Sequence, residues 1–153
     1  MSVIRRNNNV IFAANYINMY QFTTPIRVRY AETDQMGVVY YGNYAQYFEV
    51  GRVETIRSLG MSYKALEDMG VMLPVVEMNI KYLRPAHYDD VLNIQTTVKE
   101  LPTDHKITFH QEIFNEAGKL ITTGTVWLYF LDKETRKRVK IPNDLHEKLS
   151  TYF

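Results

Sequence analysis

Apolar and polar residues alternate along several segments of the chain, and this period of two predicts β-strands with one buried face. In the first segment, residues 24–30, Ile26, Val28 and Tyr30 alternate with arginines. The later segments with this pattern are residues 76–82, 92–98, 107–113 and the long run 119–131. Residues 115–118 have the composition of a hairpin turn, so we expect the last two strands, and by extension the sheet, to be antiparallel.

The segment 43–59 has a different period. Its apolar residues recur at three- and four-residue spacing, which predicts an α-helix. Asn43 is expected to cap the first turn, with Gln46 completing a capping box, and Gly60 is expected to end the helix. Further apolar residues lie beyond the main stripe, so other structure should enclose this helix over much of its girth. Shorter helices are expected at residues 62–69 and 142–153.

One long helix followed by a run of antiparallel strands predicts an α+β fold in which the sheet curls around the helix, although other α+β topologies share this order. The 153 residues, 46% of them hydrophobic, suffice for one sizeable core but not for two ordinary domains. We expect an N-terminal appendage at residues 1–20 and one domain at residues 21–153. Arg5 and Arg6 precede a short apolar run, as in a signal peptide, but asparagines interrupt it and no cleavage site follows.

Charge and composition narrow the classes of function. The net charge is +1, which lacks the basic excess that neutralises nucleic-acid phosphates, so no nucleic-acid partner is expected. The absence of cysteine excludes disulfides, thiolate nucleophiles and thiolate zinc sites, and it is consistent with a cytoplasmic location. No stretch predicts a membrane span. The four histidines lack metal-ligand spacing, so we expect them on the surface or in loops and expect no metal.

The residues around the start of the long helix carry the chemistry. Residues 32–44 are ETDQMGVVYYGNY, with an acid at Asp34 and Gly37 three residues later. This segment resembles the signature of the 4-hydroxybenzoyl-CoA thioesterase family of hot-dog proteins. The resemblance extends over residues 26–131 and includes the run YLRP at residues 82–85. It implies the hot-dog fold, an antiparallel sheet wrapped around one long central helix.

The resemblance implies hydrolysis of an acyl-CoA thioester to a free acid and CoA, without a dissociable cofactor. Asp34 is implied as the catalytic carboxylate, either as a nucleophile that forms a mixed anhydride or as a general base that activates water. Tyr41 is implied as a catalytic N–H donor, because unpaired N–H groups at a helix N-terminus polarise a carbonyl. The residues implied in substrate binding are Tyr40, Gly42, Asn43, Val76 and Arg84.

Tyr41 occupies a position where many bacterial relatives of this family carry histidine. A histidine shuttles protons near neutral pH, whereas a tyrosine with an ordinary pKa of about 10 mostly does not. We therefore expect a backbone role for Tyr41, with its ring lining the acyl pocket. The resemblance also implies a homodimer or homotetramer with a continuous sheet and an interfacial site. Val75 and Val76 of one chain would then face the helix N-terminus of the other.

Other interpretations compete with hydrolysis of acyl-CoA. A non-catalytic acyl-binding module would keep the groove without turnover, and the presence of Asp34 argues against it. A dehydratase or hydratase would use a histidine with an acidic partner, and Tyr41 argues against that. The sequence does not separate CoA from an acyl carrier protein as the carrier, and it does not specify the acyl group.

Three charged features outside the motif have structural as well as functional interpretations. Glu49 and Arg52 lie three residues apart on the predicted helix, so we expect an intrahelical or intersubunit ion pair. Arg84, at a strand end, is expected either to contact a CoA phosphate or to be an ordinary surface arginine. Residues 133–140 form the most basic stretch and are expected to be a solvated hairpin.

Overall fold

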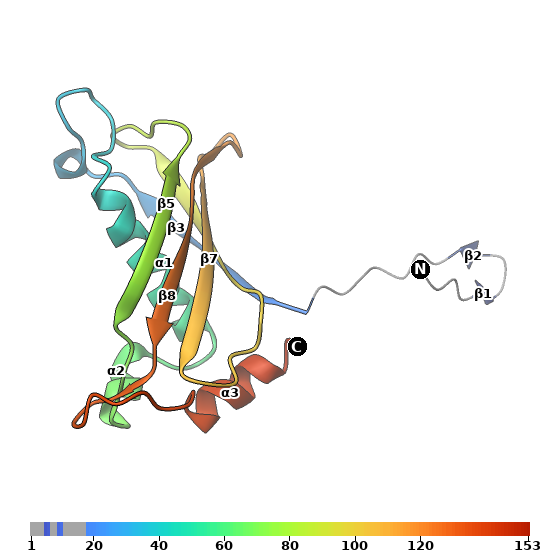
Figure 1. Cartoon of the computed structure of the whole chain (residues 1–153). Coiled ribbons are helices and arrows are strands. Elements are labelled where there is room, and N and C mark those ends of the chain that lie inside the picture. Colours follow the sequence, from blue (N-terminus) through green and yellow to red (C-terminus); the bar gives the residue numbers. More distant parts are fainter. Residues whose placement is uncertain (1–4, 7–8, 11–17) are drawn as a thin grey trace.

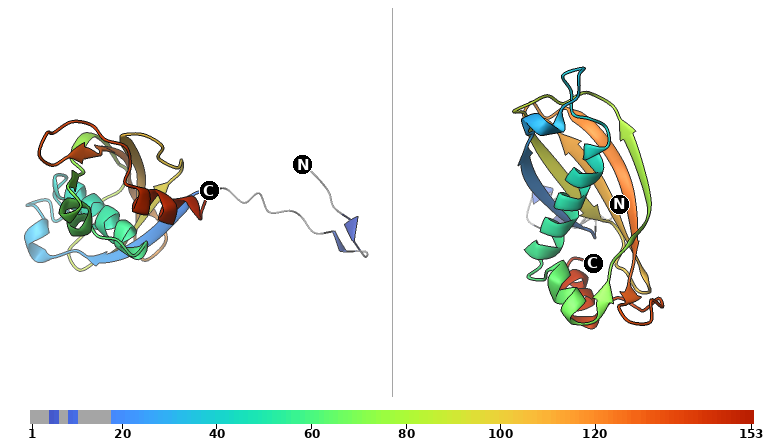
Figure 2. Two further views of the ribbon diagram at one scale, coloured as in Figure 1. Left: turned by 90° about the horizontal axis from the view of Figure 1, so that it is seen from below. Right: turned by 90° about the vertical axis from the view of Figure 1, so that its left-hand side faces the viewer.

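The computed structural model describes residues 5–6, 9–10 and 18–153. Within these residues, five strands form one antiparallel sheet in the order β3-β6-β7-β8-β5. Their bounds are β3 (Tyr20–Arg27), β5 (Val75–Tyr82), β6 (Val91–Val98), β7 (Lys106–Phe114) and β8 (Leu120–Tyr129). The sheet curves around helix α1 (Asn43–Ser58), as Figure 1 shows. In Figure 2 the helix crosses the concave face of the sheet, which is the predicted hot-dog arrangement.

The remaining elements are short. The helical ones are η1 (Tyr30–Glu32), α2 (Tyr63–Asp68) and α3 (Asn143–Ser150). Two small antiparallel pairs join β1 (Arg5–Arg6) to β2 (Asn9–Val10) and β4 (Val71–Met72) to β9 (Leu131–Asp132). The helices α2 and α3 lie at the end of the molecule opposite η1 (Figure 1). Residues 1–4, 7–8 and 11–17 of the predicted appendage lie outside the described residues.

Two glycines bring α1 close to the sheet. A Cβ on Gly51 of α1 would lie 2.6 Å from Ile94 Cγ2 and 2.8 Å from Thr96 Oγ1, both in β6. A Cβ on Gly124 of β8 would lie 2.5 Å from Cε2 of Phe48, whose ring is fully buried. Carbon atoms do not approach at such distances, so helix and sheet keep this spacing only because both positions are glycine.

A polar network fills part of the space between α1 and the sheet. Arg52 is only 4% exposed, and its Nη1 donates to Gln111 Oε1 at 3.2 Å. Gln111 Nε2 donates in turn to the carbonyl of Phe48 and to Thr96 Oγ1, both at 2.9 Å. Burial lowers the pKa of Arg52. The predicted intrahelical pair with Glu49 is wrong, because the described residues form no such salt bridge and Glu49 is exposed. An intersubunit pair stays a prediction.

The first strand differs from its prediction. It covers residues 20–27 rather than 24–30, and Tyr30, predicted to be buried, is 78% exposed. The chain leaves the sheet after Arg27 and turns through η1. The alternation of apolar and polar residues in the sequence therefore extends beyond the end of the strand. The exposed ring of Tyr30 packs edge-on against Tyr88 instead, with a centroid distance of 5.6 Å. The two shorter helices and the end of α1 follow the predictions, and Gly60 has the expected positive φ of 79°.

Candidate active site

The loop between η1 and α1 holds Asp34 in a short hairpin. The N–H of Asp34 donates to the carbonyl of Val38, and the N–H of Gly37 donates to the carbonyl of Asp34, both at 2.9 Å. Gly37 has a φ of 77°, a conformation that favours glycine. One carboxylate oxygen of Asp34, Oδ1, accepts from the N–H of Met36 at 2.8 Å. The other has no hydrogen bond from the described residues, so it is available for chemistry in a half-buried position.

The chain then turns sharply into α1. The N–H of Tyr40 donates to the carbonyl of Glu32, and the N–H of Asn43 donates to the carbonyl of Tyr40, both at 2.9 Å. Between these donors, the N–H groups of Tyr41 and Gly42 have no hydrogen-bond acceptor in the described part of the chain. Unpaired N–H groups at a helix N-terminus carry partial positive charge. They therefore form a pair of donors suited to a carbonyl oxygen or an oxyanion.

Asn43 is not the N-cap that the sequence predicts. It is the first residue of α1, and the N-cap is Gly42, which has no side chain to cap the helix. The amide of Asn43 instead reaches back to the loop, where Nδ2 donates to the carbonyl of Glu32 at 2.8 Å. This bond leaves the helix N-terminus uncapped by any side chain and ties it to the segment that leads to Asp34.

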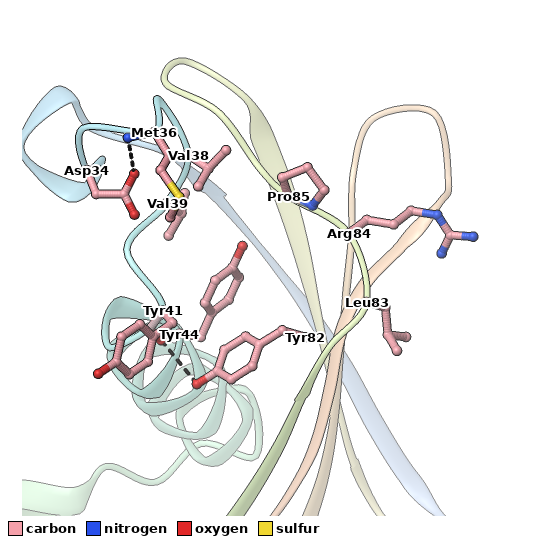
Figure 3. Close-up of a pocket in the computed structure, with 10 residues that line it drawn as sticks. All are labelled: Asp34, Met36, Val38, Val39, Tyr41, Tyr44, Tyr82, Leu83, Arg84 and Pro85. Atoms are coloured by element: carbon pink, nitrogen blue, oxygen red, sulfur yellow. Dashed lines mark hydrogen bonds between the residues drawn. The ribbon is translucent and has the colours of Figure 1, made fainter.

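A cavity of about 310 Å³ opens between the Asp34 loop, the start of α1 and the end of β5 (Figure 3). Of the residues predicted for the site, it brings together Asp34, Tyr41 and Arg84. The rest of its lining is apolar or aromatic and comprises Met36, Val38, Val39, Tyr44, Tyr82, Leu83 and Pro85. A single carboxylate thus stands at the edge of an apolar pocket, next to a helix N-terminus.

The sequence model that represents the thioesterase-like superfamily matches residues 28–149, which is most of the chain and includes every element of this site. The chain belongs to the thioesterase-like superfamily.

Individual members of the superfamily are similar over most of their length. YneP of Bacillus subtilis (strain 168), a candidate acyl-CoA thioesterase by name, is 41% identical over 75% of this chain and 83% of its own. The acyl-CoA thioester hydrolase YbgC of Escherichia coli O157:H7 is 32% identical over 84% of this chain and 96% of its own. Among solved structures, the DHNA-CoA thioesterase from Staphylococcus aureus superposes with a TM-score of 0.81 at 38% identity, covering 86% and 89% of the two chains. These likenesses confirm the predicted family, the hot-dog fold and the thioester hydrolase class.

Three tyrosines of this thioesterase surround the mouth of the cavity. The ring centroids of Tyr41 and Tyr82 lie 6.2 Å apart, and those of Tyr44 and Tyr82 lie 5.5 Å apart, both pairs edge to face. The hydroxyl of Tyr82 donates to the carbonyl of Tyr41 at 3.3 Å, the dashed line between these residues in Figure 3. Tyr44 is buried, and burial raises the pKa of its phenol. The hydrogen bond between Tyr82 and Tyr41 joins the end of β5 to the turn that begins α1.

Four of the five predicted substrate-binding residues do not line the cavity of the single chain, namely Tyr40, Gly42, Asn43 and Val76. The exposed ring of Tyr40 lies over Gly42, where a Cβ would be 2.9 Å from Tyr40 Cε1. A larger residue at the N-cap would therefore require the exposed Tyr40 ring to move. Val76 is on β5, is 45% exposed and does not line the cavity.

Arg84 lines the cavity but directs its charge elsewhere. Figure 3 shows its guanidinium pointing away from Asp34. Its Nη1 donates to the carbonyl of Leu120 at 2.8 Å, on the strand that follows the β7–β8 turn. A contact between Arg84 and a CoA phosphate stays a prediction, and it would use the remaining N–H groups of this exposed residue.

Among the cavity residues from outside the loop, the sequence predictions included Arg84 but missed Tyr44, Tyr82, Leu83 and Pro85. Tyr44 lies in the first turn of α1, three residues after Tyr41, which precedes the helix. Residues 82–83 and Pro85 belong to the YLRP run that the family resemblance includes, but nothing in their spacing shows that they approach Asp34.

Residues 5–6, 9–10 and 18–153 contain no group of three or more His, Cys, Asp or Glu side chains arranged to hold a metal ion. No helix in that part of the chain is long and apolar enough to cross a membrane. Two histidines depart from the prediction of surface or loop positions, because His110 lies within β7 and His146 within α3, and both are half-buried.

Proposed function

We propose that this member of the superfamily hydrolyses acyl-CoA thioesters, with Asp34 and the first turn of α1 as its catalytic groups. The acyl-CoA substrate is supported by YneP, YbgC and the DHNA-CoA thioesterase, whose names all assign them to this chemistry. The mechanism is carried by one observation. A carboxylate and the free N–H groups of Tyr41 and Gly42 belong to the same short stretch of chain beside one apolar cavity.

The N–H groups act on the thioester carbonyl. When a nucleophile attacks the carbonyl carbon, negative charge develops on the oxygen, and donors already in place stabilise that charge without reorganisation. One such donor contributes about 3 kcal/mol in the transition state, a rate factor of about a hundred. The role of Tyr41 is therefore in its backbone, and its phenol lines the acyl pocket.

Asp34 supplies the nucleophile by one of two routes that use the same geometry. In the first, a carboxylate oxygen attacks the carbonyl carbon, the C–S bond breaks and CoA leaves as a thiolate that takes a proton from water. Water then hydrolyses the resulting mixed anhydride to the free acid and restores Asp34. In the second, Asp34 takes a proton from water as the water oxygen attacks, and the departing thiolate receives that proton. Both routes end in a free acid and free CoA.

We further propose that two chains pair through the free edge of β5. The strands β3 and β5 are the two edges of the sheet, but β3 contains Pro25, which cannot donate to a neighbouring strand. No proline interrupts β5, where Val75 and Val76 are 44% and 45% exposed. Pairing there would bury both valines and make the two sheets continuous.

The proposed hydrolysis is tested by thiol release from a panel of short-chain, long-chain and aromatic acyl-CoAs. We expect Asp34→Asn to lower kcat/KM at least about a hundredfold, because the carboxylate is lost as base or nucleophile. Tyr41→Phe is expected to retain activity within about threefold, since its N–H group remains. Asp68→Asn is the matched control, because it removes the same charge from an exposed position on α2, where Asp68 pairs with Lys64.

Several outcomes decide between the alternatives. Equal losses in Asp34→Asn and Tyr41→Phe would contradict the separation of carboxylate and backbone roles. Release from an acylated carrier protein, but from none of the acyl-CoAs, would reassign the carrier. No release from any thioester would identify an acyl-binding module. An acyl group found on Asp34 by mass spectrometry after rapid quenching would select the anhydride route.

A further inference from the structure

A buried carboxylate lies two residues before Asp34 and outside the cavity. Glu32 is 5% exposed and is not among the residues that line the pocket. Its Oε2 accepts from the N–H of Arg29 and from the hydroxyl of Tyr47, both at 2.8 Å. Its Oε1 accepts from Arg29 Nε at 2.9 Å and from Nη2 at 2.6 Å. Four hydrogen bonds therefore converge on one side chain that the proposed reaction does not use.

The backbone of Glu32 makes a second set of contacts. Its carbonyl accepts from the N–H of Tyr40 at 2.9 Å and from Asn43 Nδ2 at 2.8 Å. Tyr40 comes just before the free N–H groups, and Asn43 is the first residue of α1. Through Tyr47, the side chain of Glu32 reaches the second turn of the same helix. Glu32 is therefore hydrogen-bonded to Tyr40, Asn43 and Tyr47, three residues at or near the start of α1.

The ionised state of Glu32 is maintained by its partners. Burial alone would raise its pKa, but the hydrogen bonds from Arg29 and Tyr47 outweigh burial and hold the pKa of Glu32 below its ordinary value. Burial and the bond to Glu32 likewise raise the pKa of the Tyr47 phenol, which stays a hydrogen-bond donor. A buried charge is costly unless it is fully satisfied, and an apolar side chain would fill the space at lower cost. Apolar contacts are non-directional, whereas the hydrogen bonds of Glu32 hold the loop and the helix at a defined distance from each other.

We propose that Glu32 is a positioning residue, which holds the Asp34 carboxylate at a fixed offset from the N–H groups of Tyr41 and Gly42. The inference rests on the proposed hydrolysis. Asp34 lies in the hairpin that starts two residues after Glu32, and the bonds of Glu32 join the segment just before this hairpin to the residues at the start of α1. Misplacement of a catalytic group by about 1 Å costs up to about a hundredfold in rate. Loosening this connection is therefore expected to lower kcat more than it weakens substrate binding.

The test compares two tyrosine hydroxyls at opposite ends of α1. Tyr47→Phe removes the bond to Glu32, whereas Tyr20→Phe removes the bond between Tyr20 and Ser58 Oγ (2.6 Å) at the last residue of the helix. Both tyrosines are buried, so a similar fall in thermal midpoint is expected for both variants. We expect Tyr47→Phe to lower kcat about tenfold with KM within about twofold, and Tyr20→Phe to leave both within about twofold.

A second variant covers the case in which Tyr47→Phe does not fold. The side chain of Arg29 is 76% exposed, so Arg29→Ala removes two bonds from Glu32 without opening the core, and the same selective loss of kcat is expected. If Tyr47→Phe and Arg29→Ala keep the kcat of the wild type, or if Tyr20→Phe loses as much, the positioning role is wrong. Failure of the proposed function has a different signature, because the wild-type protein itself would then release no thiol.

Discussion

Replacing Gly51 with alanine adds one methyl group where α1 touches the sheet. In most helices this change is favourable, because alanine exceeds glycine in helix propensity by about 1 kcal/mol. Here the added Cβ would lie 2.6 Å from Ile94 Cγ2, 2.8 Å from Thr96 Oγ1 and 2.9 Å from Gln111 Nε2. All three neighbours are fully buried side chains, and Gln111 is held by its own hydrogen bonds. The helix must therefore move away from the sheet to accommodate the methyl group.

The two effects have opposite signs, and the structure indicates which is larger. Overpacking a filled core costs about 1–3 kcal/mol, and three simultaneous contacts below 3.0 Å place Gly51→Ala in the upper half of that range. Subtracting the gain of about 1 kcal/mol in helix propensity leaves a net destabilisation of about 1–2 kcal/mol. For a chain of this length the midpoint of thermal unfolding should fall by about 2–8 °C.

The measurement is urea unfolding together with thermal unfolding, followed by circular dichroism. Gln46→Ala serves as the control, because it places alanine at an exposed position of the same helix and should change stability by less than about 0.5 kcal/mol. The sign of the result decides the question. A stabilised Gly51→Ala protein would mean that helix propensity dominates and that the close approach of α1 to β6 is not enforced at this position.

Two further predictions concern charge and assembly. Because the pKa of Glu32 is lowered by folding, its contribution to stability should be present above the ordinary value of 4.5 and be lost as the pH falls through the lower folded-state value. Urea titrations from pH 7 downwards should therefore show the stability gap between wild type and Glu32→Gln narrowing in acid, and a gap that widens would refute the assignment. Val76→Lys puts a charge on the exposed edge of β5 and should shift a dimer towards monomer in sedimentation experiments, whereas a monomeric wild type would exclude pairing through this edge.

Much of the fold could be predicted because its determinants are local. The alternation of apolar residues along residues 92–98 and the three- and four-residue spacing along residues 43–59 reflect the geometry of strands and helices, so β6 and α1 appear at nearly the predicted bounds. The first strand was misplaced for the same reason. Alternation persists through Tyr30 although the chain has already left the sheet, and only the pairing of β3 with β6 shows where the strand ends.

The candidate site likewise contains features set by local sequence and features set by tertiary structure. The family resemblance placed Asp34 and Tyr41 in the site because the hairpin and the helix start form a single continuous motif, and the structure places both beside one cavity, whereas their catalytic roles stay a prediction. Asn43 was correctly placed at the helix start but given the wrong partner. Its amide binds the carbonyl of Glu32, eleven residues earlier, and that choice depends on how the loop folds back over the helix.

The sequence by itself determined the helix, most of the strands and the family, and it indicated Asp34 as the candidate carboxylate, since each depends on residues that are near neighbours in the chain. Tertiary structure alone decided what surrounds that carboxylate. It brings Tyr82 to the carbonyl of Tyr41 across 41 positions and pairs Arg52 with Gln111 across 59. These contacts depend on the curvature of the sheet around α1 and on which side chains lose their water, and neither quantity is encoded in local spacing.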